Sequence, residues 1–125
     1  MIKILLYILI PVALNSCYTV ERSCLPFHRG TFKFSQIING EIKTSTFSRD
    51  SIFEIETFEG KIDTATIRWV NDCECILTKL TPVSNQEKRP IKIKIISTQD
   101  KTYKFEYSLV GDIKNTRRGT VQKIY

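Results

Sequence analysis

Histidine, glycine-rich motifs and clustered acidic residues are scarce in this chain of 125 residues. His28 is the single histidine, and its spacing from the cysteines does not match a paired zinc motif. The five glycines form no phosphate-binding loop, and no serine stands in a nucleophile elbow. Asp63, Asp72 and Glu74 are too scattered to hold a metal ion. The sequence therefore carries no enzyme signature, and we expect neither catalysis nor a cofactor.

The composition is that of one small folded domain with a basic balance. Hydrophobic residues make up 42% of the chain and aromatic residues 10%, which is enough for one modest core. Nineteen basic residues against thirteen acidic ones give a net charge of +6. Such a balance favours anionic surfaces such as phosphate-bearing lipids through screened attraction, and charged side chains on solvated strand faces explain it equally well.

The first sixteen residues have the architecture of an export signal. Lys3 is followed by an uncharged run that ends at a small residue before Cys17. As a helix, residues 4–14 would span about 16 Å, against ~30 Å for the hydrocarbon core of a bilayer. A permanent transmembrane helix is therefore disfavoured, and we predict a signal peptide over residues 1–16.

Residues 14–17, Leu-Asn-Ser-Cys, resemble the lipobox of bacterial lipoproteins. The resemblance implies a diacylglyceryl thioether on Cys17, cleavage before it, and acylation of the new amine with a chain such as palmitate. Each buried methylene contributes ~0.8 kcal/mol, so several chains anchor firmly. We therefore expect a lipid-anchored protein of the bacterial cell envelope, at the outer membrane or periplasmic face. An ordinary signal peptide that ends near a structural cysteine is the alternative.

Export would also place the chain where disulfides persist. With Cys17 lipidated, Cys24, Cys73 and Cys75 remain. Cys73 and Cys75 would lie on one strand face with Cα atoms ~6.6 Å apart and parallel side chains, a poor geometry for pairing with each other. Either could pair with Cys24. The remaining thiol would be a buried apolar group or, alternatively, the reactive thiol of an accessory enzyme.

Eight short segments show the alternation of apolar and polar residues that is typical of β-strands. Asn39-Gly40 between two of them indicates a type I′ hairpin, and Asn71-Asp72 is predicted to form another tight turn. No segment has convincing helical periodicity. The predicted strands cover residues 31–38, 41–47, 52–58, 61–70, 73–80, 90–96, 102–109 and 120–124.

These strands predict an all-β fold, an antiparallel meander of about eight strands. A meander of this length must curl or close to protect its edges, so we expect a small up-and-down barrel or a strongly coiled sheet. A two-sheet sandwich is the alternative. The β domain would occupy residues 30–125, and residues 17–29 would form a lipidated tether with His28 on its surface.

Aromatic side chains are predicted to line the interior of such a barrel. They would either fill it or, in a wider barrel, surround a small apolar ligand as in a lipocalin-like carrier. Glu54 and Glu56 alternate with Phe53 and Ile55, and are predicted to lie on the solvated face. The candidate lining residues are Phe32, Phe34, Phe53, Trp69, Tyr103, Phe105 and Tyr107.

Six short motifs extend over most of the chain that would follow the signal peptide. They are Ser-Cys-Tyr at 16–18, Glu-Arg-Ser-Cys at 21–24, Gly-Thr-Phe-Lys-Phe at 30–34, Ile-Phe-Glu-Ile-Glu-Thr-Phe-Glu-Gly at 52–60, Ile-Arg-Trp-Val-Asn-Asp-Cys-Glu at 67–74 and Gly-Thr-Val at 119–121. Together they resemble a family of small, uncharacterised bacterial lipoproteins whose members are often labelled DNA topoisomerase IV by automatic naming. In that family an aromatic residue is expected at the position of Cys75, so the resemblance implies a bridge between Cys24 and Cys73.

The topoisomerase label conflicts with the chemistry of this chain. Strand passage needs a nucleotide-binding domain, a positioned tyrosine with an acidic metal site, and a gate of several hundred residues, none of which can be located in the sequence. A lipidated, exported chain would not meet chromosomal DNA. We therefore expect no nucleic-acid partner. The expected role is non-catalytic, binding or structural, with the membrane as partner through the lipid and an envelope protein or glycan as a second partner.

Overall fold

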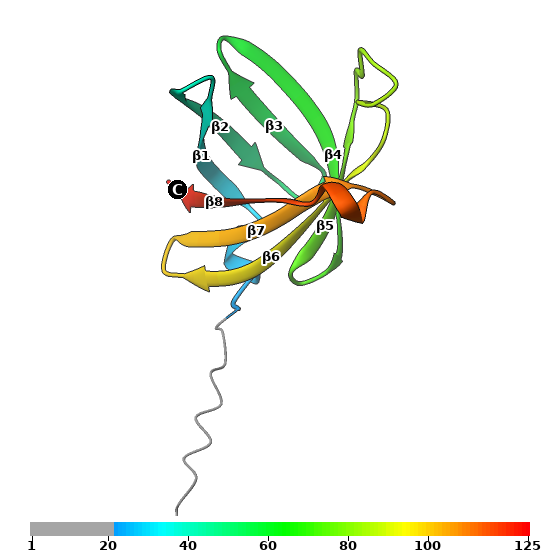
Figure 1. Cartoon of the computed structure of the whole chain (residues 1–125). Coiled ribbons are helices and arrows are strands. Elements are labelled where there is room, and N and C mark those ends of the chain that lie inside the picture. The colour runs from blue at the N-terminus through cyan, green and yellow to red at the C-terminus, as the bar shows by residue number, and fades with distance from the viewer. Residues whose placement is uncertain (1–21) are drawn as a thin grey trace, which may run out of the picture.

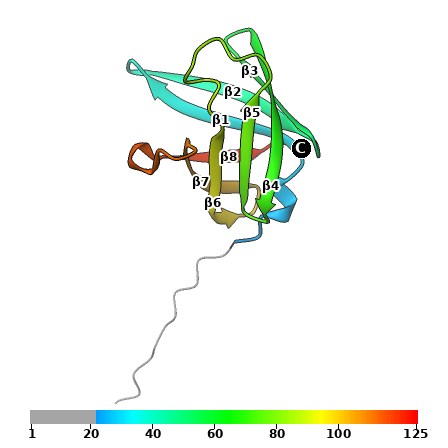
Figure 2. The same cartoon turned by 90° about the vertical axis from the view of Figure 1, so that its right-hand side faces the viewer.

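The computed structural model describes residues 22–125, which form eight antiparallel strands that close into a barrel (Figures 1 and 2). Each strand pairs with the next in sequence, and β1 pairs with β8 to close the sheet, with Phe34 opposite Val121. The predicted up-and-down barrel is confirmed and the two-sheet sandwich is wrong. The strands are β1 (Gly30–Ile38), β2 (Glu41–Arg49), β3 (Phe53–Phe58), β4 (Lys61–Asn71), β5 (Glu74–Lys79), β6 (Ile91–Gln99), β7 (Thr102–Leu109) and β8 (Arg117–Lys123).

Two short 3-10 helices accompany the strands, η1 (Leu25–Phe27) and η2 (Ile113–Asn115). No helix in the described part of the chain is long and apolar enough to cross a membrane. The predicted signal peptide and the predicted lipidation at Cys17 lie outside the described residues.

Tight turns between consecutive strands set the register of the sheet. Asn39 and Gly40 have φ values of 51° and 79°, the positive pair that a type I′ turn requires, and Ile38 faces Glu41 across the hairpin. Glu59 and Gly60 repeat this geometry between β3 and β4, with φ values of 49° and 78°. The predicted Asn-Gly hairpin is therefore confirmed.

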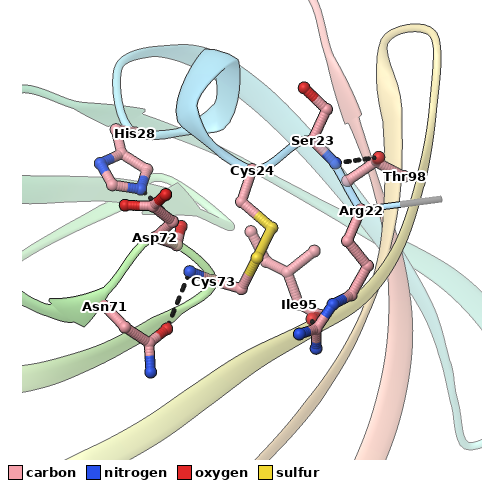
Figure 3. Close-up of a disulfide and its surroundings, with 9 residues drawn as sticks. All are labelled: Arg22, Ser23, Cys24, His28, Asn71, Asp72, Cys73, Ile95 and Thr98. Carbon is pink, nitrogen blue, oxygen red and sulfur yellow. Dashed lines mark hydrogen bonds between the residues drawn. A yellow bond between two sulfur atoms is a disulfide. The ribbon is translucent and has the colours of Figure 1, made fainter.

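The turn between β4 and β5 lies one residue later than predicted. Asn71 still belongs to β4 and pairs with Glu74, so the turn residues are Asp72 and Cys73, and β5 begins after Cys73. A bulge between Trp69 and Asn71 shifts the register. The side-chain oxygen of Asn71 accepts a hydrogen bond of 2.9 Å from the backbone N–H of Cys73, which stabilises the later turn (Figure 3).

The barrel is closed at the end where the described chain begins. Phe27 of η1 is buried there and packs edge-on against Tyr103, with ring centroids 5.0 Å apart. The Nζ of Lys123 donates a hydrogen bond of 2.6 Å to the carbonyl of Pro26, which fastens η1 to the end of β8. Residues 22–29, predicted to be part of a tether, are thus packed against the barrel.

A disulfide between Cys24 and Cys73 completes this closed end (Figure 3). It joins the residue before η1 to the β4–β5 turn, 49 positions away in sequence. In the chain-entropy model a loop of this length stabilises the fold by roughly 4 kcal/mol. The bridge that the family resemblance implied is therefore confirmed.

Candidate ligand-binding cavity

The other half of the barrel interior contains an open cavity of about 250 Å³. It extends from Arg49 and Tyr103, near the closed end, to Gln36, Phe58 and Tyr107 at the far ends of their strands. Its lining residues come from β1, β2, β3, β5, β6, β7 and β8. They are Phe34, Gln36, Ser45, Phe47, Arg49, Glu54, Glu56, Phe58, Leu77, Ile91, Ile93, Tyr103, Phe105, Tyr107 and Val121.

Four of the seven aromatic residues predicted to line the interior do line this cavity. Phe34 and Phe105 meet edge to face, with ring centroids 5.5 Å apart, and Tyr107 stacks on Phe105 at 5.4 Å. Tyr103 forms the floor, and burial raises the pKa of its phenol to about 12, so the hydroxyl is neutral at physiological pH. The interior is filled by side chains in the closed half and leaves an unfilled space in the other half.

The other three predicted lining residues lie elsewhere. Phe32 is fully buried in the closed half, where it stacks on Phe47 with ring centroids 5.2 Å apart. Trp69 lies near the closed end, stacked on His28. Phe53 lies on the outer face of β3, because its neighbour Glu54 faces the cavity and side chains alternate along a strand.

Glu54 and Glu56 face the interior, which corrects their predicted placement on the solvated face. Ile55 between them is exposed instead. The register decides this orientation, because Glu54 lies opposite Arg49 of β2 and opposite Ala65 of β4, whose side chains both point inward. Alternation alone shows which residues share a face, and it does not show which face is covered.

Arg49 is a functional candidate that the sequence reasoning missed. Its side chain is only 2% exposed, and its Nε donates a hydrogen bond of 2.8 Å to Glu54 Oε1. Its Nη1 donates to the carbonyl of Phe27 at 3.1 Å. The predicted strand ended at residue 47, but β2 continues to Arg49, which shares the inner face with Ser45 and Phe47. The alternation Ser45, Phe47, Arg49 was a signal that could have placed this arginine inside.

Aromatic rings surround the guanidinium of Arg49 in the closed half. Its central carbon lies 4.9 to 5.8 Å from the ring centroids of four residues, a range in which cation–π attraction stabilises a buried cation. The charge is therefore compensated from two directions, by the carboxylate of Glu54 and by the ring faces. The four aromatic residues are Phe32, Phe47, Trp69 and Tyr103.

Glu56 differs from Glu54 because no basic side chain of residues 22–125 forms an ion pair with it. Burial raises the pKa of this half-buried carboxyl above its usual value, and the neighbouring charge of Glu54 raises it further. A hydrogen bond from Ser45 acts in the opposite direction. The nearby Lys79 is already bound to Asp63 at 3.0 Å and to Glu87 at 2.9 Å.

Cys75 is completely buried in the core. Burial raises the pKa of its thiol to about 12, so the reactive thiolate is absent at neutral pH. The alternative of a thiol-dependent accessory enzyme gains no support from this environment.

His28 is not the partnerless surface residue that was predicted. Its ring stacks on Trp69 with centroids 3.6 Å apart, and its Nε2 donates a hydrogen bond of 2.7 Å to the carbonyl of Asp72 (Figure 3). His28 thereby attaches the segment after η1 to the β4–β5 turn. Its role is structural and belongs to the closed end.

Metal binding has no support in the described residues, because no three histidine, cysteine or acidic side chains of residues 22–125 converge on one point. Comparison of the chain with protein-family models, curated proteins and solved structures finds no match. The cavity, with its aromatic wall and its single unpaired carboxylate, is therefore the feature from which a function can be inferred.

Proposed function

We propose that the protein is a non-catalytic binding protein of the bacterial cell envelope and that the barrel cavity takes a small ligand. The observation that carries this proposal is the cavity of about 250 Å³ in one half of a barrel whose other half is packed and closed. Ligand sites are typically concave, largely apolar and equipped with a few polar groups, and this cavity has that composition. The cavity favours a carrier or receptor over a purely structural component.

The anchor proposed at Cys17 would fix the orientation of the barrel. Arg22 and Ser23 lie against β6 at the closed end, where Ser23 N donates to Thr98 Oγ1 at 2.8 Å (Figure 3). Cys17 precedes Arg22 by five positions, which an extended chain spans in at most about 18 Å. The closed end would then face the lipid surface, and the cavity would open toward the aqueous side. The disulfide supports this compartment, because such bonds persist in oxidising surroundings.

Native mass spectrometry of protein extracted from the envelope in mild detergent tests the ligand. We expect a bound small molecule that is released on unfolding, and an empty barrel in every preparation would contradict the proposal. Gln36→Trp fills the mouth of the cavity from an exposed rim position and should abolish this adduct. Gln122→Trp introduces the same side chain on the outer face of β8 and should leave the adduct intact.

The anchor has its own test. The intact mass of the purified protein should correspond to a chain that begins at Cys17 and carries acyl groups. Cys17→Ala should move the protein from the membrane fraction to the soluble fraction. An unmodified, unprocessed wild-type chain in the cytosolic fraction would contradict the proposed location.

A protein partner is a second proposal, supported by exposed isoleucines at the hairpin tips. Ile37 and Ile42 face each other across β1 and β2 and are each 75% exposed, and Ile62 on β4 is similarly exposed. Apolar side chains gathered on a surface often mark a contact with another protein. Crosslinking in the native envelope should capture a partner through wild-type protein and not through an Ile37→Lys, Ile42→Lys variant.

A further inference from the structure

Three acidic or basic side chains of the Glu, Asp, Lys or Arg type line the cavity, and two of them neutralise each other. Arg49 and Glu54 form an ion pair of 2.8 Å that is almost completely buried. Glu56 forms no ion pair with any residue of the described chain. The charge that remains in the cavity is therefore a single carboxylate.

Arg49 is already engaged by groups of the protein itself. Glu54 occupies its Nε, the carbonyl of Phe27 occupies its Nη1, and aromatic rings surround its guanidinium. A ligand carboxylate or phosphate would compete with Glu54 for the guanidinium and would lie in a cavity that also contains the like charge of Glu56, so anions should bind least well.

The groups around Glu56 make this part of the interior acidic, although the whole chain has a net charge of +6. Glu54 on the same strand and Asp63 opposite Glu56 on β4 are both acidic. The nearby base Lys79 of β5 is held by Asp63 and Glu87. A positive ligand group would thus meet a negative local potential and would supply the missing partner of Glu56.

The remaining cavity wall is apolar and largely aromatic. Phe34, Phe105 and Tyr107 form a continuous set of ring contacts, and Phe58 and Ile91 add apolar surface. Aromatic faces attract cations as well as apolar groups. The volume of about 250 Å³ exceeds the ~150 Å³ that suffices for benzene in an apolar cavity.

We propose that the cavity binds a small organic ammonium ion, with Glu56 as its counter-charge and the aromatic wall around its apolar body. This assignment rests on the proposed function, since it names the ligand class for the same cavity. A single ammonium group fits one unpaired carboxylate, and a body of benzene size with a short side chain fits the volume.

Protonation of Glu56 would couple ligand binding to pH. Its neighbours are Glu54 on β3, Arg49 and Ser45 on β2, Asp63 on β4 and Lys79 on β5. Burial holds the pKa of Glu56 above the usual glutamate value of 4.5, so binding should weaken at a higher pH than an ordinary glutamate would allow. Acidification should therefore release the ligand.

Titration calorimetry of the full chain with three probes of similar size tests the proposal. The probes are 2-phenylethylamine, 2-phenylethanol and 3-phenylpropanoate, which present a cation, a neutral group and an anion on the same ring. We expect the amine to bind about tenfold more tightly than the alcohol, since only the amine forms a charge-assisted hydrogen bond to the carboxylate of Glu56. The anion should bind most weakly.

Two matched variants locate the effect. Glu56→Gln should bring the affinities for the amine and the alcohol to within about twofold, because the counter-charge is gone while the wall remains. Glu41→Gln removes the same charge from an exposed position and should leave the tenfold preference intact. An unchanged preference in Glu56→Gln would overturn the assignment of Glu56.

The outcomes separate the ligand class from the proposed function. Equal affinity for amine and alcohol, or tighter binding of the anion, would overturn the ammonium ligand and leave a small-molecule-binding barrel. Failure of the amine to bind at all would overturn the ammonium ligand in every case. The proposed function would also be overturned only if 2-phenylethanol did not bind either and the native protein carried no small molecule.

Discussion

The two halves of the barrel interior differ in how closely they are packed. The closed half is filled by Phe27, Phe32, Cys75 and Ile95, and is fastened by a disulfide and by hydrogen bonds from Lys123 and His28. The open half contains a cavity and the carboxylate of Glu56, which forms no ion pair with any residue of 22–125. A closely packed interior stabilises a fold, whereas an unfilled space and a buried charge without an ion-pair partner reduce its stability. The comparison indicates that the closed half supports the fold, and the open half is where we place the proposed ligand.

Loss of the disulfide should have the largest effect on stability. Cys24→Ser releases the constraint on a loop of 49 positions, so the free energy of unfolding should fall by about 4 kcal/mol. Urea denaturation followed by fluorescence of Trp69 measures this change. A reductant should destabilise the wild type by a similar amount and leave Cys24→Ser unchanged. If the wild type and Cys24→Ser were equally stable without reductant, the stability of the fold would not depend on this disulfide.

Loss of the buried Arg49 should have the second-largest effect on stability. Arg49→Met leaves Glu54 without a partner in the interior, and we expect a loss of about 3 kcal/mol in the free energy of unfolding. The double variant Arg49→Met, Glu54→Gln removes both charges and should recover part of that loss, again by urea denaturation. A double variant that is less stable than Arg49→Met would contradict the view that the unpaired carboxylate causes the damage.

Neutralising Glu56 should have a smaller effect and should increase the free energy of unfolding at pH 7. A raised pKa means that the folded state binds the proton more tightly than the unfolded chain. The contribution of Glu56 to stability is thus fully present below about pH 4.5 and is lost as the pH rises through the folded-state pKa. Glu56→Gln should therefore match the wild type below that pH and be more stable at pH 7. Thermal unfolding over a range of pH checks this, with Glu41→Gln as the control that shows no such gain.

An exposed ion pair at the surface should matter least. Arg118 Nη2 lies 2.8 Å from Glu106 Oε1, but the arginine side chain is 74% exposed. Arg118→Ala should change the free energy of unfolding by less than about 0.5 kcal/mol, because solvent screens such pairs. A loss as large as that of Arg49→Met would show that stability is not concentrated in the closed half.

The sequence was informative about strands and turns and much less so about the site. Asn39-Gly40 has a local chemistry that admits one turn type, so the first hairpin could be placed without knowledge of its surroundings. The turn was predicted one residue too early. A hydrogen bond from the backbone N–H of Cys73 to the side-chain oxygen of Asn71, together with a bulge in β4, places it at Asp72 and Cys73. The local sequence therefore determines that a strand or turn forms, and tertiary contacts decide at which residue it begins and ends.

The candidate site was the least predictable part. Arg49 lay outside the predicted strands. Glu54 and Glu56 were predicted to face solvent, because charged side chains are rarely buried. Their burial depends on partners that are distant in space or on the neighbouring strand, namely the rings around Arg49 and its ion pair with Glu54. Sequence alternation placed Phe34, Phe105 and Tyr107 on the inner face correctly and could not show that a space would remain between them.

By itself the sequence determined that this chain is a meander of eight short strands, since alternation and turn chemistry act over a few residues. Closure of the barrel, the inward face of β3 and the pairing of Cys24 with Cys73 were decided by the tertiary structure. The physical reason is that strand propensity is local, whereas the inside of a barrel exists only after its first and last strands have paired.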